Sequence, residues 1–155
     1  MKKDIIIREA VESDHTFIFE LSPYLAEVAQ LHWHSNDVIQ KMQDEYIAQM
    51  LANTSEPNVT YIAEVDKELL GFIHARTHKD SISGEVCGTI PLLAVSPKSQ
   101  GLGVGKQLVE KAEIWAKSSG CRLLHLEVFA NNKKASSFYQ NIGFEPETLH
   151  MIKPL

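Results

Sequence analysis

The sequence predicts an α/β (α+β) protein with a mixed sheet, and three observations lead to that class. The 155 residues suffice for one domain with a substantial core. Apolar residues recur at helical spacing in some segments and form short β-branched runs in others. The expected helices and strands follow one another without strict alternation, and the strand–helix–strand unit around residues 94–129 requires a parallel crossover. We therefore expect a single domain over residues 1–155.

The first part of the chain is expected to form one strand and two helices. Residues 5–8 are a β-branched run typical of an edge strand. Ser13 can cap a helix, and Pro23 falls inside its apolar pattern. Because proline removes a hydrogen bond and clashes with the preceding turn, we expect a kink or break near Ser22. A second helix follows the loop at residues 31–37.

Three strands are expected next, and one of them should be irregular. Residues 59–65 and 69–76 read as a hairpin around "DKE", and residues 86–95 read as a third strand. Pro91 lies inside that strand and cannot donate to a ladder, so it marks an edge or a bulge. The remaining elements are a helix over residues 102–118, a strand over 123–129, a helix that Asn131 or Asn132 caps and Gly143 ends, and a final strand over 147–153.

Composition and charge narrow the functional classes. The net charge of −5 disfavours nucleic-acid binding, which depends on basic surface. No segment is long and apolar enough to suggest a membrane span, and residues 1–8 do not resemble a signal peptide. Cys87 and Cys121 read as free thiols in a reducing compartment. We therefore expect a cytoplasmic protein without nucleic-acid or membrane partners.

The segment "GLGVGK", residues 101–106, points to a phosphate ligand. Its three glycines alternate before an expected helix, and backbone N–H groups at such a place can hold an anion. A dinucleotide fingerprint fails, because its third glycine would fall on Lys106. A nucleoside-triphosphate loop also fails, because it needs a glycine at Gln100 and a hydroxyl at Gln107. A loop that only turns the chain is the remaining alternative.

Two segments resemble the GNAT superfamily, the acyl-coenzyme A-dependent N-acyltransferases. "VSPKSQGLGVGKQL" matches the family's Val-x-Pro-x-x-Arg/Gln-Gly-x-Gly-x-Gly/Ala segment. "LEVFANNKKASSFYQNIGF" matches its second segment of Leu-x-Val, Asn, Ala, Tyr and Gly-Phe, in the same order along the chain. The resemblance implies a GNAT-like fold, with a central mixed, mostly antiparallel sheet flanked by about four helices. It also implies one N-acetyltransferase domain over residues 1–155.

The resemblance further implies that acetyl-CoA is the co-substrate, with no metal. The loop would hold the pyrophosphate through backbone N–H groups, and the pantetheine arm would lie along residues 93–95 like an added strand. Lys106 is equally readable as a solvated lysine, and Asn132 as a helix cap. The expected cofactor-binding residues are Leu93, Ala94, Val95, Gln100, Gly101, Leu102, Gly103, Val104, Gly105, Lys106, Asn132 and Ala135.

The implied reaction is direct attack of a primary amine on the thioester in a ternary complex. The amine must lose a proton, the oxyanion needs a donor and the departing thiolate needs a proton. Tyr139 matches the family's tyrosine and is the expected general acid, although a core tyrosine is the alternative. A backbone N–H near Leu93 or Ala94 would stabilise the oxyanion. Transfer through an acetylated Cys87 is a disfavoured alternative.

The general base is left open by the sequence. Many family members place a glutamate where this chain has Pro91. His74 is a candidate, because an imidazole titrates near neutrality. Glu85 and Glu27 are others, each acting through water, and a water chain to bulk solvent could replace all three. Each of these side chains has a purely structural reading as well.

The acceptor site implied by the resemblance lies along the first two helices and their loop. Glu27, His32 and Trp33 are its candidate residues, although the loop can also be read as a solvated one. His32 and His34 do not form a zinc pattern. The acceptor is an amine of a small molecule or peptide, and a homodimer through the late strands is possible. A non-catalytic acyl-CoA-binding regulatory module is the alternative function.

Overall fold

The structure is a computed structural model that describes residues 3–155. Met1 and Lys2 lie outside the described residues. They are the first two residues of the segment 1–8, for which the sequence predicts no signal peptide. The strands are β1 (Ile6–Glu9), β2 (Asn58–Val65), β3 (Glu68–Lys79), β4 (Val86–Val95) and β5 (Leu124–Leu126). The α-helices are α1 (His15–Glu20), α2 (Ser22–Glu27), α3 (Asn36–Ala52), α4 (Val104–Ser118) and α5 (Lys133–Asn141).

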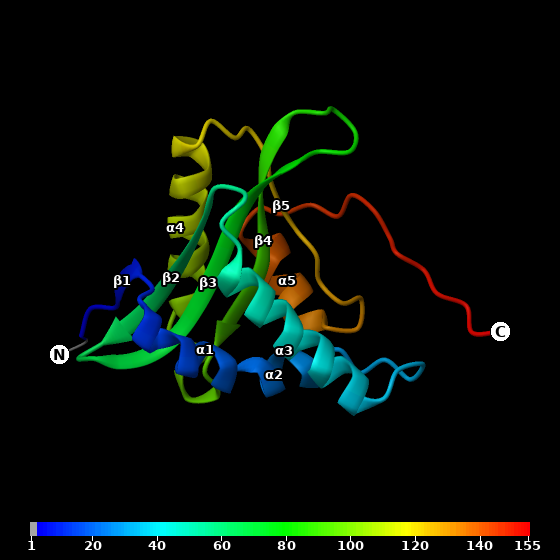
Figure 1. The fold of residues 1–155 in the computed structure, drawn as a ribbon, viewed down its shortest axis with the longest axis horizontal. Coiled ribbons are helices and arrows are strands. Elements are labelled where there is room, and N and C mark those ends of the chain that lie inside the picture. Colours follow the sequence, from blue (N-terminus) through cyan, green and yellow to red (C-terminus); the bar gives the residue numbers. More distant parts are fainter. Residues whose placement is uncertain (1–2) are drawn as a thin grey trace.

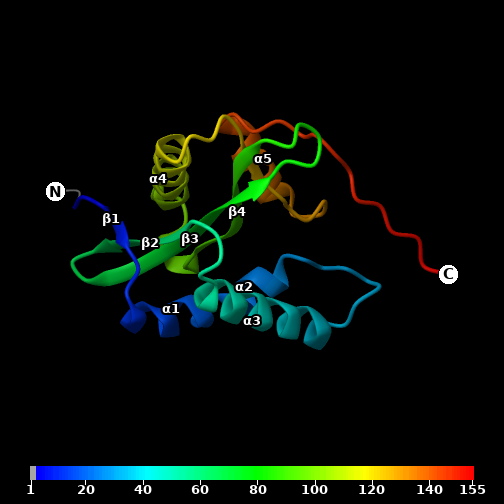
Figure 2. The same cartoon turned by 45° about the horizontal axis from the view of Figure 1, so that its top comes forward.

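One sheet organises the molecule, and it confirms the predicted fold class. Its five strands lie in the order β1-β2-β3-β4-β5. Neighbours are antiparallel except β4 and β5, which are parallel because α4 connects them. Helices α1, α2 and α3 cover one face, and α4 and α5 lie on the other (Figures 1 and 2). None of the helices within residues 3–155 combines the length and apolar character that a membrane span requires.

Local chemistry explains where several elements begin and end. Helices α1 and α2 are the halves of the first predicted helix, interrupted at Leu21 with Pro23 in the first turn of α2. The Ser35 hydroxyl accepts a hydrogen bond from the N–H of Val38 and caps α3. Asp66 and Lys67 join β2 to β3, and their φ angles of 49° and 69° suit the tight turn of a hairpin.

The predicted irregularity at Pro91 is a β-bulge. His74 pairs with Leu92 and Arg76 pairs with Thr89, so Ala75 faces the two residues Ile90 and Pro91. The extra residue re-aims the side chains that follow it. Up to Ile90 the even-numbered side chains of β4 face α4, and from Leu92 onward they face α1, α2 and α3.

Two apolar layers on either side of the sheet hold the domain together, and β4 contributes to both. Ile90 belongs to the layer under α4, with Leu108 and Ala112. Leu92 and Ala94 belong to the opposite layer. That layer also contains Ile18, Leu21, Ile47, Met50, Ile62 and Phe72. The bulge is the point at which the even-numbered residues of β4 change layers, and beyond it Leu93 and Val95 pack against the layer under α4.

The predicted final strand over residues 147–153 is wrong. Residues 145–155 form neither helix nor strand, and the chain runs away from the sheet (Figure 1). Leu149 and Met151 are 82% and 84% exposed. A strand needs a neighbour that satisfies its backbone groups, and no strand within residues 3–155 takes that place beside the tail. The strand predicted over 123–129 is also shorter than expected, because β5 ends at Leu126.

Candidate active site

The site is built around the place where β4 and β5 part. The two strands pair from Gly88 opposite Leu124 to Ile90 opposite Leu126. β5 then ends, whereas β4 continues to Val95 with no strand neighbour on that side within residues 3–155. The sheet therefore offers one open strand edge, and it lies just before the glycine loop.

The open edge of β4 presents the backbone N–H groups of Leu93 and Val95. The N–H of Ser96 donates to the carbonyl of Leu70 on β3 at 2.8 Å. Because the N–H groups of a strand point alternately to its two sides, those of Leu93 and Val95 point away from β3. The N–H of Ala94 points toward β3, so of the two predicted oxyanion donors only Leu93 faces the opening.

The glycine loop leads into the N-terminus of α4 without a side-chain cap. Gly101 and Gly103 have φ angles of 83° and 79°, in the left-handed region that favours glycine. Gly103 is the N-cap residue, and the first helical bond runs from the N–H of Gln107 to its carbonyl at 3.2 Å. The N–H groups of residues 104–106 therefore have no partner inside the helix and are available to an anion.

The side chains of the loop divide between core and solvent. Val104 is buried under the sheet and anchors the start of α4. Leu102 and Lys106 are exposed. Gln100 accepts a hydrogen bond of 2.6 Å from the ammonium group of Lys134 on α5. Lys134 thus places a positive charge beside the loop, and only its place near the start of a predicted helix could have pointed to it.

Helix α5 packs directly against the loop. A Cβ atom at Gly105 would lie 3.3 Å from the ring of Phe138, so glycine there permits close contact between α4 and α5. Both views show α5 beside the β4–β5 side of the sheet (Figures 1 and 2). The predicted donor residues of β4, the loop and α5 are therefore brought to one part of the molecule.

Tyr139 follows Phe138 on α5 and is largely buried. Its ring lies 5.3 Å from the ring of Phe138 and 5.7 Å from that of Phe144. Burial raises the pKa of Tyr139 to about 12. The phenol therefore keeps its proton at neutral pH, as a proton donor requires.

Asn132 is the N-cap of α5, which is one of its two predicted roles. Its side-chain oxygen accepts a hydrogen bond from the N–H of Ala135 at 3.2 Å. This bond uses the oxygen and leaves the amide N–H₂ group for another contact. The cap also fixes the position of Ala135, which is half-buried in the first turn of α5.

His74 lies on β3 but is enclosed by the core. The side chain is 1% exposed, and its Nδ1 shares a hydrogen bond of 2.8 Å with the hydroxyl of Thr60. Burial, together with the charge of Arg76, lowers the pKa of His74 to about 4. A neutral imidazole with that pKa is a weak base, which favours the structural reading of this residue.

Glu85 lies at the far end of β4 from the glycine loop. It precedes the first residue of the strand, roughly 25 Å along the backbone from Leu93 at the usual rise of a strand. Its carboxylate forms an ion pair with Arg122, and that pairing lowers its pKa. The structure thus does not bring Glu85 to the opening between β4 and β5.

The predicted acceptor residues lie on and beside the loop between α2 and α3. Glu27 is exposed at the end of α2. The rings of His32 and Trp33 meet edge to face at 4.7 Å, and both side chains are exposed. This loop is tied to the segment before α5, because the side-chain amide of Asn131 donates to the carbonyl of Gln30 at 2.8 Å. Sequence reasoning identified Asn131 only as a possible cap.

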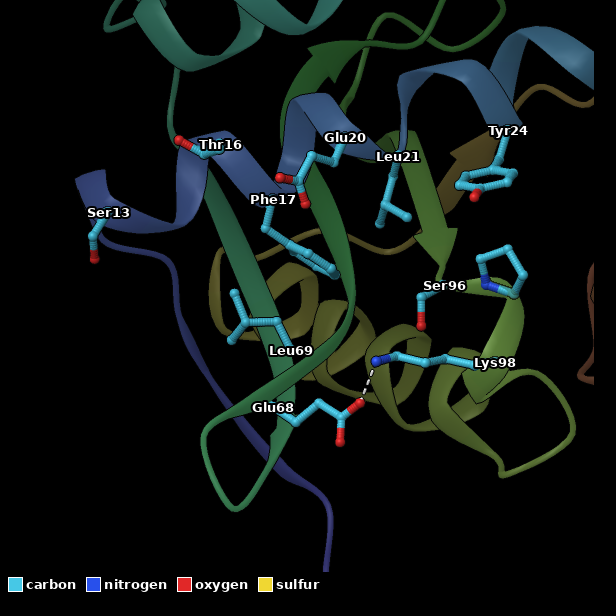
Figure 3. A pocket seen from close by; sticks show the side chains of 11 residues that line it. Ser13, Thr16, Phe17, Glu20, Leu21, Tyr24, Glu68, Leu69, Ser96 and Lys98 are labelled. Atoms are coloured by element: carbon cyan, nitrogen blue, oxygen red, sulfur yellow. Dashed lines mark ion pairs between the residues drawn. The ribbon is translucent and has the colours of Figure 1, made fainter.

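A separate cavity of about 670 Å³ lies between the first helices and the adjoining ends of β3 and β4. Figure 3 shows its lining, in which Lys98 forms an ion pair with Glu68. Glu20 and Tyr24 line the side formed by α1 and α2. The cavity contains none of the residues predicted for the acetyl donor, and it does not include Glu27, His32 or Trp33.

Known proteins share both the sequence pattern and the fold. Mycothiol acetyltransferase of Acidothermus cellulolyticus is 26% identical over 147 residues, which are 88% of this chain but 42% of that protein. The chain thus spans less than half the length of that relative. A putative acetyl transferase from Pyrococcus furiosus has the same fold, with a TM-score of 0.77, 24% identity and coverage of 98% of this chain and 100% of that one.

The fold also occurs in a structure that contains coenzyme A. The aminoglycoside N-acetyltransferase AAC(6')-Iy in complex with CoA has a TM-score of 0.72 and 20% identity, and the match covers 100% of this chain and 97% of that one. The sequence model of the Acetyltransferase (GNAT) family matches residues 25–144, which include the open edge of β4, the glycine loop and α5. The chain therefore belongs to the acetyltransferase (GNAT) family.

Proposed function

We propose that this protein transfers an acetyl group from acetyl-CoA to a primary amine by direct attack in a ternary complex. The observation that carries the proposal is the opening between β4 and β5 beside the uncapped N-terminus of α4. The opening would receive the pantetheine arm along Leu93 and Val95, and the helix N-terminus would receive the pyrophosphate. CoA-bound relatives with the same fold support this donor.

The reaction requires one group that stabilises the carbonyl oxygen and one that protonates the departing thiolate. The amine nitrogen forms a bond to the carbonyl carbon, and the N–H of Leu93 would stabilise the resulting oxyanion. The carbon–sulfur bond then breaks, and Tyr139 would donate its proton to the departing thiolate. The position of Tyr139 on α5, the helix beside the glycine loop, supports this role, and the raised pKa means only that the phenol is protonated at neutral pH, as an ordinary phenol is. The products are an N-acetyl amine and free coenzyme A.

The acceptor amine would lose its proton to water rather than to a buried side chain. His74 is enclosed and has a lowered pKa, and Glu85 lies at the other end of β4. A chain of water molecules, with or without exposed Glu27 at its outer end, is therefore the proposed base. Proton loss before attack is required, because a lysine-like ammonium group has a pKa of about 10.

The acceptor is proposed to be a small-molecule amine that binds beside the loop between α2 and α3. Exposed Trp33 and His32 and the carboxylate of Glu27 would form its walls. Relatives are named for aminoglycosides and mycothiol, which are small molecules. A cytoplasmic location suits the free thiols Cys87 and Cys121.

The test measures the release of free thiol from acetyl-CoA across aminoglycosides, polyamines and amino acids. We expect saturable release with at least one amine and an acetylated product in the mass spectrum. Calorimetric binding of acetyl-CoA without turnover on any amine would instead support the regulatory module. Failure to bind acetyl-CoA at all would overturn both functions.

A homodimer is proposed from the exposed tail. Leu149 and Met151 project apolar surface into solvent, and β5 is the short strand at one edge of the sheet. A second copy could cover both features. Analytical ultracentrifugation of the full chain and of a chain ending at Glu147 would compare the masses. A monomeric full chain across the accessible concentrations would contradict the proposal.

A further inference from the structure

Three side chains that bind transition metals meet where β3, β4 and β5 run side by side. His78 on β3 pairs directly with Cys87 on β4, and Thr89, two residues further along β4, pairs with His125 on β5. Directly opposed residues point to the same face of a sheet, and so do residues two apart on one strand. His78, Cys87 and His125 therefore lie together on the face that carries α1, α2 and α3. We call these three residues the Cys–His–His cluster.

The donor atoms of the cluster have the separations of a metal coordination shell. His125 Nδ1 lies 3.2 Å from His78 Nε2 and 3.8 Å from Cys87 Sγ. All three donor atoms lie within 4.8 Å of one another. Tetrahedral zinc, with bonds of about 2.1 Å to nitrogen and about 2.3 Å to sulfur, sets its ligands about 3.4 Å (N to N) and about 3.6 Å (N to S) apart. The two separations from His125 Nδ1 lie close to these values, and the third, between Cys87 Sγ and His78 Nε2, is no more than 4.8 Å.

The carboxylate of Asp80 lies on the side of the His125 ring that faces away from the cluster. Asp80 Oδ1 lies 3.9 Å from Nε2 of His125, the ring nitrogen that does not face the cluster. Asp80 is itself held by the N–H and the hydroxyl of Ser83, at 2.9 Å and 2.6 Å. Metal-binding histidines commonly direct their second ring nitrogen toward a carboxylate, which fixes the ring and strengthens the ligand. Asp80 could take that role after the two groups approach by about 1 Å, since 3.9 Å is longer than a hydrogen bond.

The residues of the cluster are less exposed to solvent than histidines on the surface usually are. Cys87 is completely buried, and His78 and His125 are partly buried. The partial exposure of His125, 26% for its side chain, leaves room for a water molecule as a fourth ligand. Histidine nitrogen and cysteine sulfur are the ligand types of zinc sites, and the combination of two histidines with one cysteine also holds copper in electron-transfer proteins.

We propose that His78, Cys87 and His125 bind one Zn²⁺ ion with water as the fourth ligand. Binding replaces the proton of the Cys87 thiol by a zinc–sulfur bond and releases that proton to solvent. The ion would join three strands at the closed end of the opening between β4 and β5, where only residues 88–90 pair with β5. The site would therefore stabilise the geometry of the opening. This inference does not depend on acetyl transfer.

The same residues suggest two simpler accounts, which the experiment must separate from zinc binding. His78 and His125 could share only the hydrogen bond of 3.2 Å between their rings. Cys87 could be a nucleophile, but burial raises the pKa of its thiol, which opposes thiolate formation without a metal. Neither account predicts a stoichiometric ion.

The first measurement titrates the metal-free protein with Zn²⁺ and with Co²⁺ as a spectroscopic probe. We expect one ion per chain, a thiolate-to-cobalt charge-transfer band and the intense d–d bands of a tetrahedral site. Cys87→Ser and His125→Gln should each weaken zinc affinity by about 100-fold or more, since even outer partners of a site contribute 10–100-fold. Cys121→Ser and His150→Gln, at free and exposed positions, should leave zinc affinity unchanged.

A second measurement uses the unmodified chain, so it holds even where a variant fails to fold. Long-range proton–nitrogen NMR spectra should show zinc shifting Nε2 of His78 and Nδ1 of His125, with no change at His150. Zinc should also raise the unfolding temperature of the wild type but not that of Cys87→Ser. Sub-stoichiometric binding, binding that Cys87→Ser retains, or shifts confined to exposed histidines would each overturn the proposal.

Discussion

The side-chain amide of Asn131 donates a hydrogen bond of 2.8 Å to the backbone carbonyl of Gln30. It links the segment before α5 to the loop between α2 and α3, which are 101 residues apart in the chain. Gln30 has a φ angle of 37°, in the left-handed region that residues other than glycine seldom adopt. The bond therefore supports an unfavourable turn at the start of the loop that carries His32 and Trp33.

Asn131→Ala should weaken use of the amine more than use of acetyl-CoA. Loss of one hydrogen bond costs about 0.5–1.5 kcal/mol, so the KM for the amine should rise about 2–10-fold. The KM for acetyl-CoA should stay within about twofold. Steady-state kinetics with each substrate varied in turn will measure both, and Asn141→Ala, at the exposed end of α5, is the matched control. An equal rise in both KM values would contradict a role in the acceptor loop.

Tyr139→Phe should lower kcat while acetyl-CoA still binds. The change removes only the hydroxyl, and general acid catalysis contributes about 10²–10⁴-fold. Binding should be retained within about twofold, because the ring contacts with Phe138 and Phe144 remain. Thiol-release assays and calorimetry will separate the two effects. Tyr46→Phe on α3 is the control, and a Tyr139→Phe enzyme with normal kcat would rule out the proposed acid.

Gly103→Ala should weaken acetyl-CoA binding beyond its effect on stability. A side chain at a φ angle of 79° costs about 1–2 kcal/mol, and the new Cβ would stand in the loop that faces the pyrophosphate. Gly120→Ala is the matched control, because its φ angle is 82° and neither Cβ meets an atom within 4 Å. Chemical unfolding and calorimetry should show similar destabilisation for both variants but weaker acetyl-CoA binding only for Gly103→Ala. Equal affinity in the two variants would exclude the loop from phosphate binding.

Protein stability should fall as the pH decreases from about 6.5 toward about 4, chiefly through His74. The pKa of His74 is about 4 in the folded protein, against 6.5 for the free side chain. In this range the unfolded imidazole gains a proton that the folded one does not, so acid favours unfolding. The difference corresponds to about 3 kcal/mol when both states are protonated. His78, whose pKa burial also lowers, contributes in the same direction.

Urea unfolding at about pH 7 and about pH 4.5 will measure this loss. His74→Gln should flatten the dependence, because glutamine carries no titratable proton, while wild type and His150→Gln should keep it. His150 is the control because it is exposed in the tail, outside every helix and strand. A His74→Gln protein with an undiminished slope would show that another group carries the effect.

Local patterns predicted most of the fold. The boundaries of β4 and the break before Pro23 follow from β-branched runs and from proline chemistry, which act within a few residues. The bulge at Pro91 was predictable for the same reason. The predicted strand over residues 147–153 failed, because its pattern was suitable but a strand also needs a neighbour, and that depends on the whole sheet.

The parts of the candidate site that lie within the two family motifs were predictable from the sequence. The parts outside the motifs were not. The motif located the loop and α5. The alternating direction of the backbone N–H groups along β4 was needed to show that the N–H of Leu93, not that of Ala94, faces the opening. The Asn131–Gln30 bond and the meeting of His78 with His125 join distant parts of the chain. Such contacts leave no periodic signal, because each involves single residues that the topology brings together.

The extra residue in β4 has a consequence for how this strand can change. Deleting Pro91 would leave Ile90 alone opposite Ala75, and Leu92 would stay opposite His74. Leu92 and Ala94 would keep to the layer of α1–α3, and the N–H groups of Leu93 and Val95 would still point away from β3. What the deletion would remove is the extra bend and twist that a bulge gives its strand. Because Ile90 is also the last residue of β4 that pairs with β5, Pro91 would govern how far the two strands diverge beyond that pair.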